Sequence, residues 1–169
     1  HFYNNELPRV MIVIFETAKK NAYGWFTPSK VWSDVEKSEE LHEIAMSAEY
    51  MNRDWIEVMQ TLHHEMIHLY CHIKGIKDTS RDNRYHNGKF KAQCEAHGFE
   101  YKITEPDSKI GWSRAVLTEE TTRIIANDFG LNPDAFKFAR RIDTAPKKTR
   151  NRSKYVCTDC DYSLRGKGG

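Results

Sequence analysis

The residues best suited to chemistry are the run His64-Glu65-Met66-Ile67-His68, which has the HExxH spacing. On an α-helix, residues four apart lie on one face, so His64 and His68 can reach the same metal ion. Glu65 is next to the first histidine and can reach a water molecule held on that metal. If the run is helical and binds zinc, the pattern predicts a hydrolase, and above all a peptidase.

A third metal ligand must come from another part of the chain, because a catalytic zinc ion usually has three protein ligands and an open position for water. His72 lies two turns beyond His64, about 12 Å along the axis, too far for metal–nitrogen bonds of about 2.0–2.1 Å. His63 is rotated about 100° from His64 and is also unsuited. His86 follows a polar loop that can fold back over the helix. Its rivals stand on the next predicted helix: Glu95 and His97. Spacing leaves this choice open.

The HExxH run lies inside the clearest helix of the sequence, predicted from about Asp54 to Lys74. Asp54 and Glu57 have the spacing of a capping box, and Gly75 is a natural stop. Apolar residues recur along one predicted stripe: Trp55, Val58, Met59, Leu62, Met66, Leu69 and Ile73. The run falls in the middle of this helix, which is about 30 Å long, where a rigid backbone can hold ligands.

Three strands are predicted before this helix, at residues 10–15, 23–26 and 42–50. The first is a continuous β-branched and aromatic run and is expected to be buried, whereas the third alternates and is expected to be half-buried. The second ends in a predicted turn at Thr27-Pro28-Ser29. A polar loop is predicted at residues 75–85, with later helices at 89–97, 118–130 and 132–139 and a strand at 99–103. This order predicts an α+β fold: a small β-sheet packed beside the long HExxH helix, with further helices C-terminal.

The chain has 169 residues, of which 39% are hydrophobic, and its mean hydropathy is −0.74. No apolar run approaches the about 20 residues of a membrane helix, so no membrane partner is expected. The four cysteines, with one CxxC and two singles, favour a reducing, intracellular compartment: the cytoplasm or nucleoid, or the nucleus of a eukaryote.

The net charge of +2 is unevenly distributed along the chain. Residues 145–169 contain seven Lys/Arg and two Asp/Glu, whereas the rest of the chain carries a net charge of −3. A basic tail on a mildly acidic body suggests an anionic partner, and a merely solvated terminus fits the charges equally well.

Two segments resemble the SprT-like zinc metallopeptidases, a Spartan-like family that includes a protease of DNA–protein crosslinks. Residues 61–68, TLHHEMIH, are similar to the TLxHEMIH-like helix of the family, and His86-Asn87-Gly88-Lys89-Phe90 is similar to its HxxxF or HGxxF-like segment. Residues 7–10, 23–26 and 43–47 resemble the strands that precede the helix. The resemblance covers roughly residues 1–100.

The resemblance implies that His64, His68 and His86 bind Zn²⁺ and that Glu65 is the catalytic acid/base. It also implies a compact metallopeptidase domain, which we expect at residues 1–143, and protein substrates that are associated with DNA or crosslinked to it, as in DNA repair. The tail then offers candidate phosphate contacts: Lys147, Lys148, Arg150, Arg152 and Lys154.

The end of the chain resembles half of a zinc ribbon. Many family members end in a ribbon with two CxxC pairs, and Cys157 and Cys160 look like the first pair. A closed structural zinc site needs four ligands, and none of the nine residues that follow is Cys or His. We therefore expect a basic linker at 144–155 and an incomplete zinc-ribbon-like tail at 156–169. Cys71 and Cys94 are expected to be small core residues.

Two other functions stay open at this point. The first is a non-catalytic, metal-stabilised module that binds nucleic acid or a protein partner. An intact HExxH run argues against it, because a purely structural site has no need of Glu65. The second is a peptidase that shares only the metal site and acts on an unrelated substrate.

Overall fold

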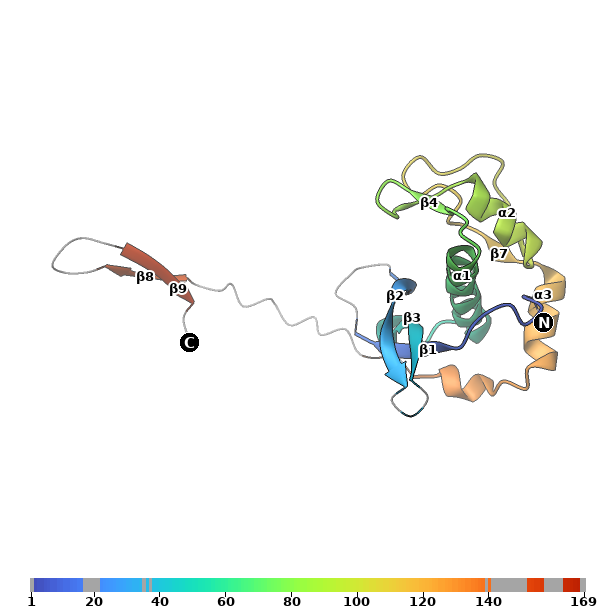
Figure 1. Cartoon of the computed structure of the whole chain (residues 1–169), viewed down its shortest axis with the longest axis horizontal. Coiled ribbons are helices and arrows are strands. Elements are labelled where there is room, and N and C mark those ends of the chain that lie inside the picture. The colour runs from blue at the N-terminus through green and yellow to red at the C-terminus, as the bar shows by residue number, and fades with distance from the viewer. Residues whose placement is uncertain are drawn as a thin grey trace.

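The computed structural model describes residues 2–16, 22–34, 36, 38–138 and 140, together with the backbone of two strands at 152–156 and 163–167. Helix α1 (Trp55–Ile73) lies in the middle of the described body, with a β-sheet on one side and helices α2 (Gly88–Ala96) and α3 (Glu119–Asp128) on the other (Figure 1). The fold is α+β, with small sheets and three α-helices among the described residues.

The largest sheet has three strands, β1 (Val10–Phe15), β2 (Gly24–Asp34) and β3 (Glu39–Ser47), in the order β1-β3-β2. The central strand β3 is parallel to β1 and antiparallel to β2, and Ala45 pairs with Val13 on one side and Trp25 on the other. The pairing of β2 is irregular between Thr27 and Trp32. Strand β2 is therefore an edge of this sheet, and it is also the strand that packs most closely on α1.

The sheet corrects three expectations from the sequence. Strand β1 is not buried: its Ile12 and Ile14 side chains are 51% and 58% exposed, because β1 is an edge strand. Strand β3 is not half-buried, because residues 44–47 lie in the central strand and are all buried. The turn expected around Pro28 is instead an irregular part of β2, where an edge strand tolerates proline because its missing N–H leaves no ladder bond unpaired.

Helix α1 begins and ends within one residue of the predicted limits. Asp54 caps its first turn by accepting a hydrogen bond from the Ile56 N–H at 2.9 Å, and Gly75, with φ of +65°, follows its end. Most of the predicted apolar stripe is confirmed, since Val58 and Leu69 are buried and Trp55, Met59 and Met66 pack against the core, but its last residue, Ile73, is 43% exposed. Other buried side chains lie outside the stripe: His63, Glu65, Ile67 and Cys71. The reason is that the sheet, α2 and α3 contact different faces of α1.

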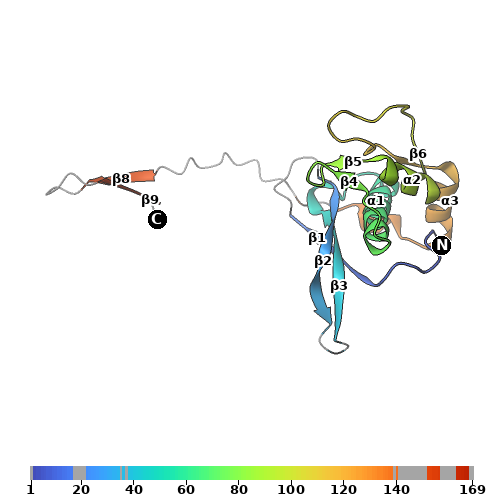
Figure 2. The same cartoon turned by 45° about the horizontal axis from the view of Figure 1, so that its top comes forward.

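The predicted loop 75–85 contains a short hairpin of β4 (Thr79–Ser80) and β5 (Tyr85–His86), which lies next to α2 (Figure 2). Strand β6 (Phe99–Glu100) pairs with β7 (Val116–Leu117), and β6 is shorter than the strand expected at 99–103. Short 3-10 helices occur at η1 (Ala48–Tyr50) and at η2 (Pro133–Phe136), where a longer helix was expected.

The main core lies between α1, α2, α3 and the β6–β7 pair. Cys71 and Cys94 are both fully buried in this core, as expected. Tyr3, also buried there, packs the N-terminal segment against the core. Its other buried members are Ile67, Phe90, Phe99, Ala115, Leu117 and Ile125. Among the described residues, no helix has both the length and the apolar character needed to span a bilayer.

The C-terminal tail is described only as the backbone of an antiparallel pair, β8 (Arg152–Val156) and β9 (Ser163–Lys167). Strand β8 crosses the predicted boundary between linker and tail. The predicted metal ligands Cys157 and Cys160 and the basic residues Lys147, Lys148 and Arg150 lie outside the described residues. The same holds for the side chains of Arg152 and Lys154.

Candidate metal centre and cleft

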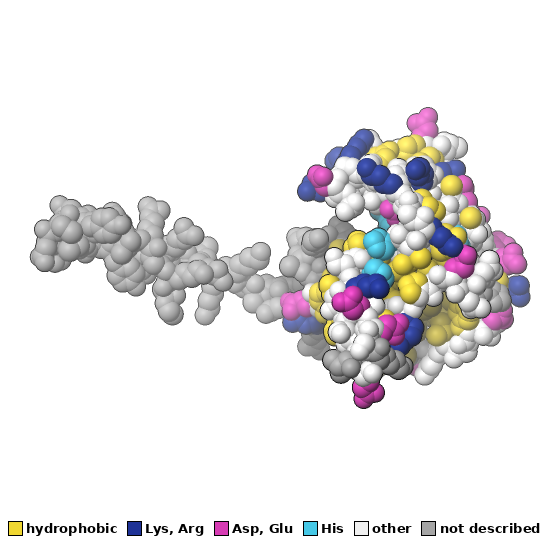
Figure 3. Space-filling model, viewed as in Figure 1, with side chains coloured by type: hydrophobic (Ala, Val, Ile, Leu, Met, Phe, Trp, Pro, Cys, Tyr) yellow, Lys and Arg dark blue, Asp and Glu magenta, His cyan; other side chains and the backbone are white. Residues whose placement is uncertain are grey.

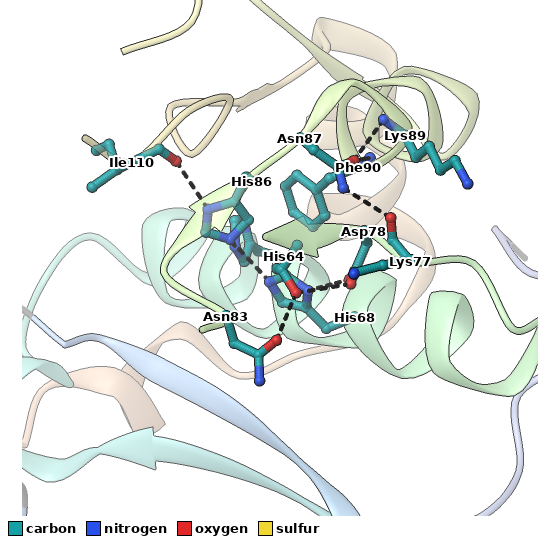
Figure 4. Close-up of polar contacts among 11 residues, drawn as sticks. His64, His68, Lys77, Asp78, Asn83, His86, Asn87, Lys89, Phe90 and Ile110 are labelled. Carbon is teal, nitrogen blue, oxygen red and sulfur yellow. Dashed lines mark hydrogen bonds and ion pairs between the residues drawn. The ribbon is translucent and has the colours of Figure 1, made fainter. Parts of the chain in front are cut away.

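Three imidazoles converge on one point between α1 and the β4–β5 hairpin (Figure 4). His64 and His68 come from successive turns of α1, and His86 is the last residue of β5. The Nε2 atom of His86 lies 3.3 Å from Nε2 of His64 and 3.1 Å from Nε2 of His68. One ligand atom from each ring falls within 4.8 Å of the others, so the three could hold one metal ion together.

The other ring nitrogens of two of these histidines are held by acceptors. Nδ1–H of His68 donates to Oδ2 of Asp78 at 2.6 Å, and Nδ1–H of His86 donates to the carbonyl of Ile110 at 3.3 Å (Figure 4). Protonation at Nδ1 leaves Nε2 as the lone-pair nitrogen in a neutral imidazole. Both rings therefore point the nitrogen that can bind a metal at the common point.

Phe90 forms the floor of the cluster. Its ring centroid lies 4.8, 4.6 and 4.5 Å from those of His64, His68 and His86, and its side chain is fully buried. Asn87 fixes Phe90 by capping α2: the side-chain oxygen of Asn87 accepts from the N–H groups of Lys89 and Phe90. The sequence segment 86–90 thus supplies one member of the triad and the surface against which all three rings pack.

Burial favours the neutral form of two of the three histidines, His64 and His86. It lowers the pKa of His64 well below the usual histidine value and lowers the pKa of His86 to about 4, and repulsion from the neighbouring histidines acts in the same direction. Neutral imidazole is the form that binds metals. Three imidazole nitrogen donors beside a cleft match the donor set of a catalytic zinc site.

Glu65 lies beside the triad, in the same cleft, and is 7% exposed. Burial raises the pKa of Glu65, while the nearby His68 and a hydrogen bond from the backbone of Phe26 oppose that shift. Gly24 on β2 allows this close approach, because a Cβ there would lie 3.3 Å from Cγ of Glu65 and 3.0 Å from the Ala45 carbonyl.

The cleft has a volume of about 1120 Å³ and runs between β2 and α1 on one side and the hairpin and residues 110–116 on the other. The space-filling view shows histidine side chains reaching the surface in this hollow (Figure 3). Three basic side chains also line it: Arg53, Lys77 and Arg114.

The rival third ligands lie elsewhere. Glu95 pairs with Lys91 at 2.9 Å on the surface of α2. His97 donates from Nδ1 to the Gln93 carbonyl at 2.7 Å and stacks on Tyr3, on the core side of α1. Neither belongs to the cluster that contains His86.

Several residues around the triad were missed by the sequence reasoning. From the sequence, Asp78 is only part of a polar loop, and Ile110 has no distinguishing feature. Asp78 could not be recognised because its contact with His68 depends on how the hairpin folds back over α1. The sequence offers a signal for Phe90 and Gly24, since both lie in segments that resemble the family.

The model of the SprT-like family matches residues 1–122. This chain belongs to the SprT-like family. The match contains α1, the β4–β5 hairpin and α2, and hence the whole triad and Glu65. No curated protein matches the chain, and no solved structure matches it. The SprT-like match extends beyond the roughly 100 residues of the resemblance seen in the sequence.

Proposed function

We propose that this SprT-like protein is a zinc-dependent metalloendopeptidase that acts on proteins associated with DNA or crosslinked to it. The observation that carries the proposal is the convergence of Nε2 of His64, His68 and His86 beside Glu65 in one open cleft. Membership of the SprT-like family supports it. The three imidazole donors favour zinc over magnesium and calcium, which prefer oxygen ligands.

Bound zinc supplies a Lewis acid and a water molecule of lowered pKa. Glu65 is the acid/base of the proposed reaction. Its carboxylate accepts the proton of the attacking water and returns it to the nitrogen of the departing amine. Burial, which raises the pKa of Glu65, suits a group that must both take and give a proton near neutral pH.

Strand β2 provides a surface for an extended polypeptide. It is an edge strand, and Tyr23 to Phe26 at its start line the cleft next to Glu65. An extended segment can add to such an edge through main-chain hydrogen bonds, which recognise a peptide without depending on its sequence.

The test is cleavage of casein by the wild type and by Glu65→Gln, with zinc content measured for both. We expect Glu65→Gln to lose about 10²–10⁴-fold in rate while retaining its zinc, because only proton transfer is removed. Glu57→Gln is the matched control, since Glu57 lines the same cleft two turns earlier on α1. Equal cleavage by the wild type and Glu65→Gln would contradict the assignment of Glu65.

The DNA-linked part of the proposal depends on the basic tail. Protein cleavage is measured with and without double-stranded DNA, for the full chain and for a chain that ends at residue 144. We expect DNA to stimulate the full chain, with a steep loss of DNA affinity as salt increases, because phosphate contacts release counterions. No stimulation of either form would contradict a DNA-associated substrate and leave the peptidase assignment intact.

A further inference from the structure

The residue just before the β4–β5 hairpin, Asp78, also points at the metal centre. Asp78, immediately before β4, places Oδ2 2.6 Å from Nδ1 of His68, and both side chains are mostly buried, at 15% and 14% exposed. A histidine ligand needs one nitrogen free for the metal and the other held by an acceptor that fixes the ring. Asp78 supplies this second function for His68.

Asp78 is itself fixed on several sides. Its backbone carbonyl accepts from the N–H of Asn87 at 3.0 Å, and the Asn87 side chain donates to the carbonyl of Lys77 at 2.8 Å, which closes the base of the hairpin. The hydroxyl of Thr79 also donates to Oδ1 of Asp78, at 3.4 Å. The carboxylate is thus held between this hydroxyl and the ring of His68.

The other outer contact to the triad is weaker. His86 is held through Nδ1 by the neutral carbonyl of Ile110, at 3.3 Å. An ionised acceptor forms a shorter and stronger hydrogen bond than a neutral one, and its charge makes the ligand more basic. Of the two contacts, the one from Asp78 is therefore the stronger hydrogen bond.

We propose that Asp78 is a positioning residue that fixes the Nδ1–H tautomer and orientation of His68 and so sets the affinity of the centre for zinc. This inference rests on the proposed metal centre. It adds to that centre a role for the loop between α1 and β4 in holding the metal. Asp78 acts through His68 and is not itself a ligand in this arrangement.

The test is zinc affinity of the full chain, measured by competition with a chromophoric chelator after the metal has been removed. We expect Asp78→Asn to bind zinc about 10–100-fold more weakly than the wild type, because the charge is lost and the amide can select the wrong tautomer. Asp82→Asn is the matched control, since it makes the same change at an exposed turn position of the same hairpin. Wild-type affinity in a folded Asp78→Asn protein would overturn the role.

A measurement on the wild type covers the case in which Asp78→Asn does not fold. Long-range ¹H–¹⁵N correlation spectra of the metal-free protein report which nitrogen of each histidine carries the proton. We expect His68 to be protonated at Nδ1; protonation at Nε2 alone would refute the inference. If the wild type binds no zinc, the metal centre itself is overturned, whereas equal binding by both proteins removes only the role of Asp78.

Discussion

His63 and His64 are adjacent on α1, yet His63 faces the core and His64 faces the cleft. On the core side, Nε2–H of His63 donates to the His97 carbonyl at 2.7 Å, and Nδ1 lies 3.2 Å from the hydroxyl of Tyr3. Both ring nitrogens are thus paired within the protein. On the cleft side, Nε2 of His64 faces the Nε2 atoms of His68 and His86.

Burial alone does not separate these two kinds of histidine. His63 is 4% exposed, and desolvation lowers the pKa of both His63 and His64. The difference is what the lone pairs meet: a hydroxyl donor on the core side, and other imidazole nitrogens on the cleft side. Unshared lone pairs that converge are suited to a cation, whereas paired ones serve only to hold the fold.

Removing His63 and His64 one at a time separates the roles of the two sides. We expect His64→Ala to weaken zinc binding by more than about 100-fold, because a direct ligand is lost. Losing a residue that only hydrogen-bonds to a ligand weakens binding by about 10–100-fold. His63→Ala is expected to keep near-wild-type zinc affinity and to lose stability instead. Chelator competition and chemical denaturation measure the two effects, and similar zinc affinities for the two variants would show the distinction to be wrong.

Phe90 belongs to both regions, since it is fully buried in the core and packs against all three rings of the triad. We expect Phe90→Ala to lower the free energy of unfolding of the metal-free protein by about 3–5 kcal/mol through the cavity it leaves. Urea denaturation measures this loss. Phe138→Ala is the control, because Phe138 is 79% exposed and its loss should cost less than about 0.5 kcal/mol. A similarly small loss of unfolding free energy in both variants would contradict a stabilising role for Phe90 beneath the triad.

On the core side, His63 should make the free energy of unfolding depend on pH. Burial lowers the pKa of His63 to about 4, from an ordinary value of 6.5, with the hydrogen bond to the His97 carbonyl opposing the shift. Between these values the unfolded chain binds more protons, so the contribution of neutral His63 is complete above pH 6.5 and is lost as the pH falls towards 4.

The expected size of this contribution is roughly 3 kcal/mol for the metal-free protein. It is obtained as the difference in unfolding free energy between the wild type and His63→Gln, which cannot titrate, from pH 7.5 to pH 4. Parallel pH profiles for the two proteins would show that His63 is not responsible.

Gly24 gives the smallest effect and tests the cleft side. A Cβ at this position would meet the Ala45 carbonyl at 3.0 Å and Cγ2 of Thr61 at 3.1 Å, so Gly24→Ala is expected to cost about 1–3 kcal/mol and to slow casein cleavage by displacing Glu65. Gly88→Ala is the control, because nothing lies within 4 Å of a Cβ there. Unchanged cleavage by a folded Gly24→Ala protein would argue against a close fit of β2 to Glu65.

The limits of the three α-helices follow from the sequence alone. Asp54 and Gly75 delimit α1, Thr118 caps α3 through the N–H of Thr121, and Gly98 follows α2 with φ of +90°. These signals are local, because a cap or a left-handed residue acts within one turn of its own position. The HExxH run needed no more than helical spacing to bring its two histidines to one face.

Which residues from other parts of the chain join that face depends on the tertiary fold. Spacing could not choose between His86, Glu95 and His97, nor reveal Asp78, because the choice depends on the hairpin folding back over α1 while α2 turns its other residues away. The exposure of β1 was misjudged for the same reason: strand order, a non-local property, makes one apolar strand central and another an edge.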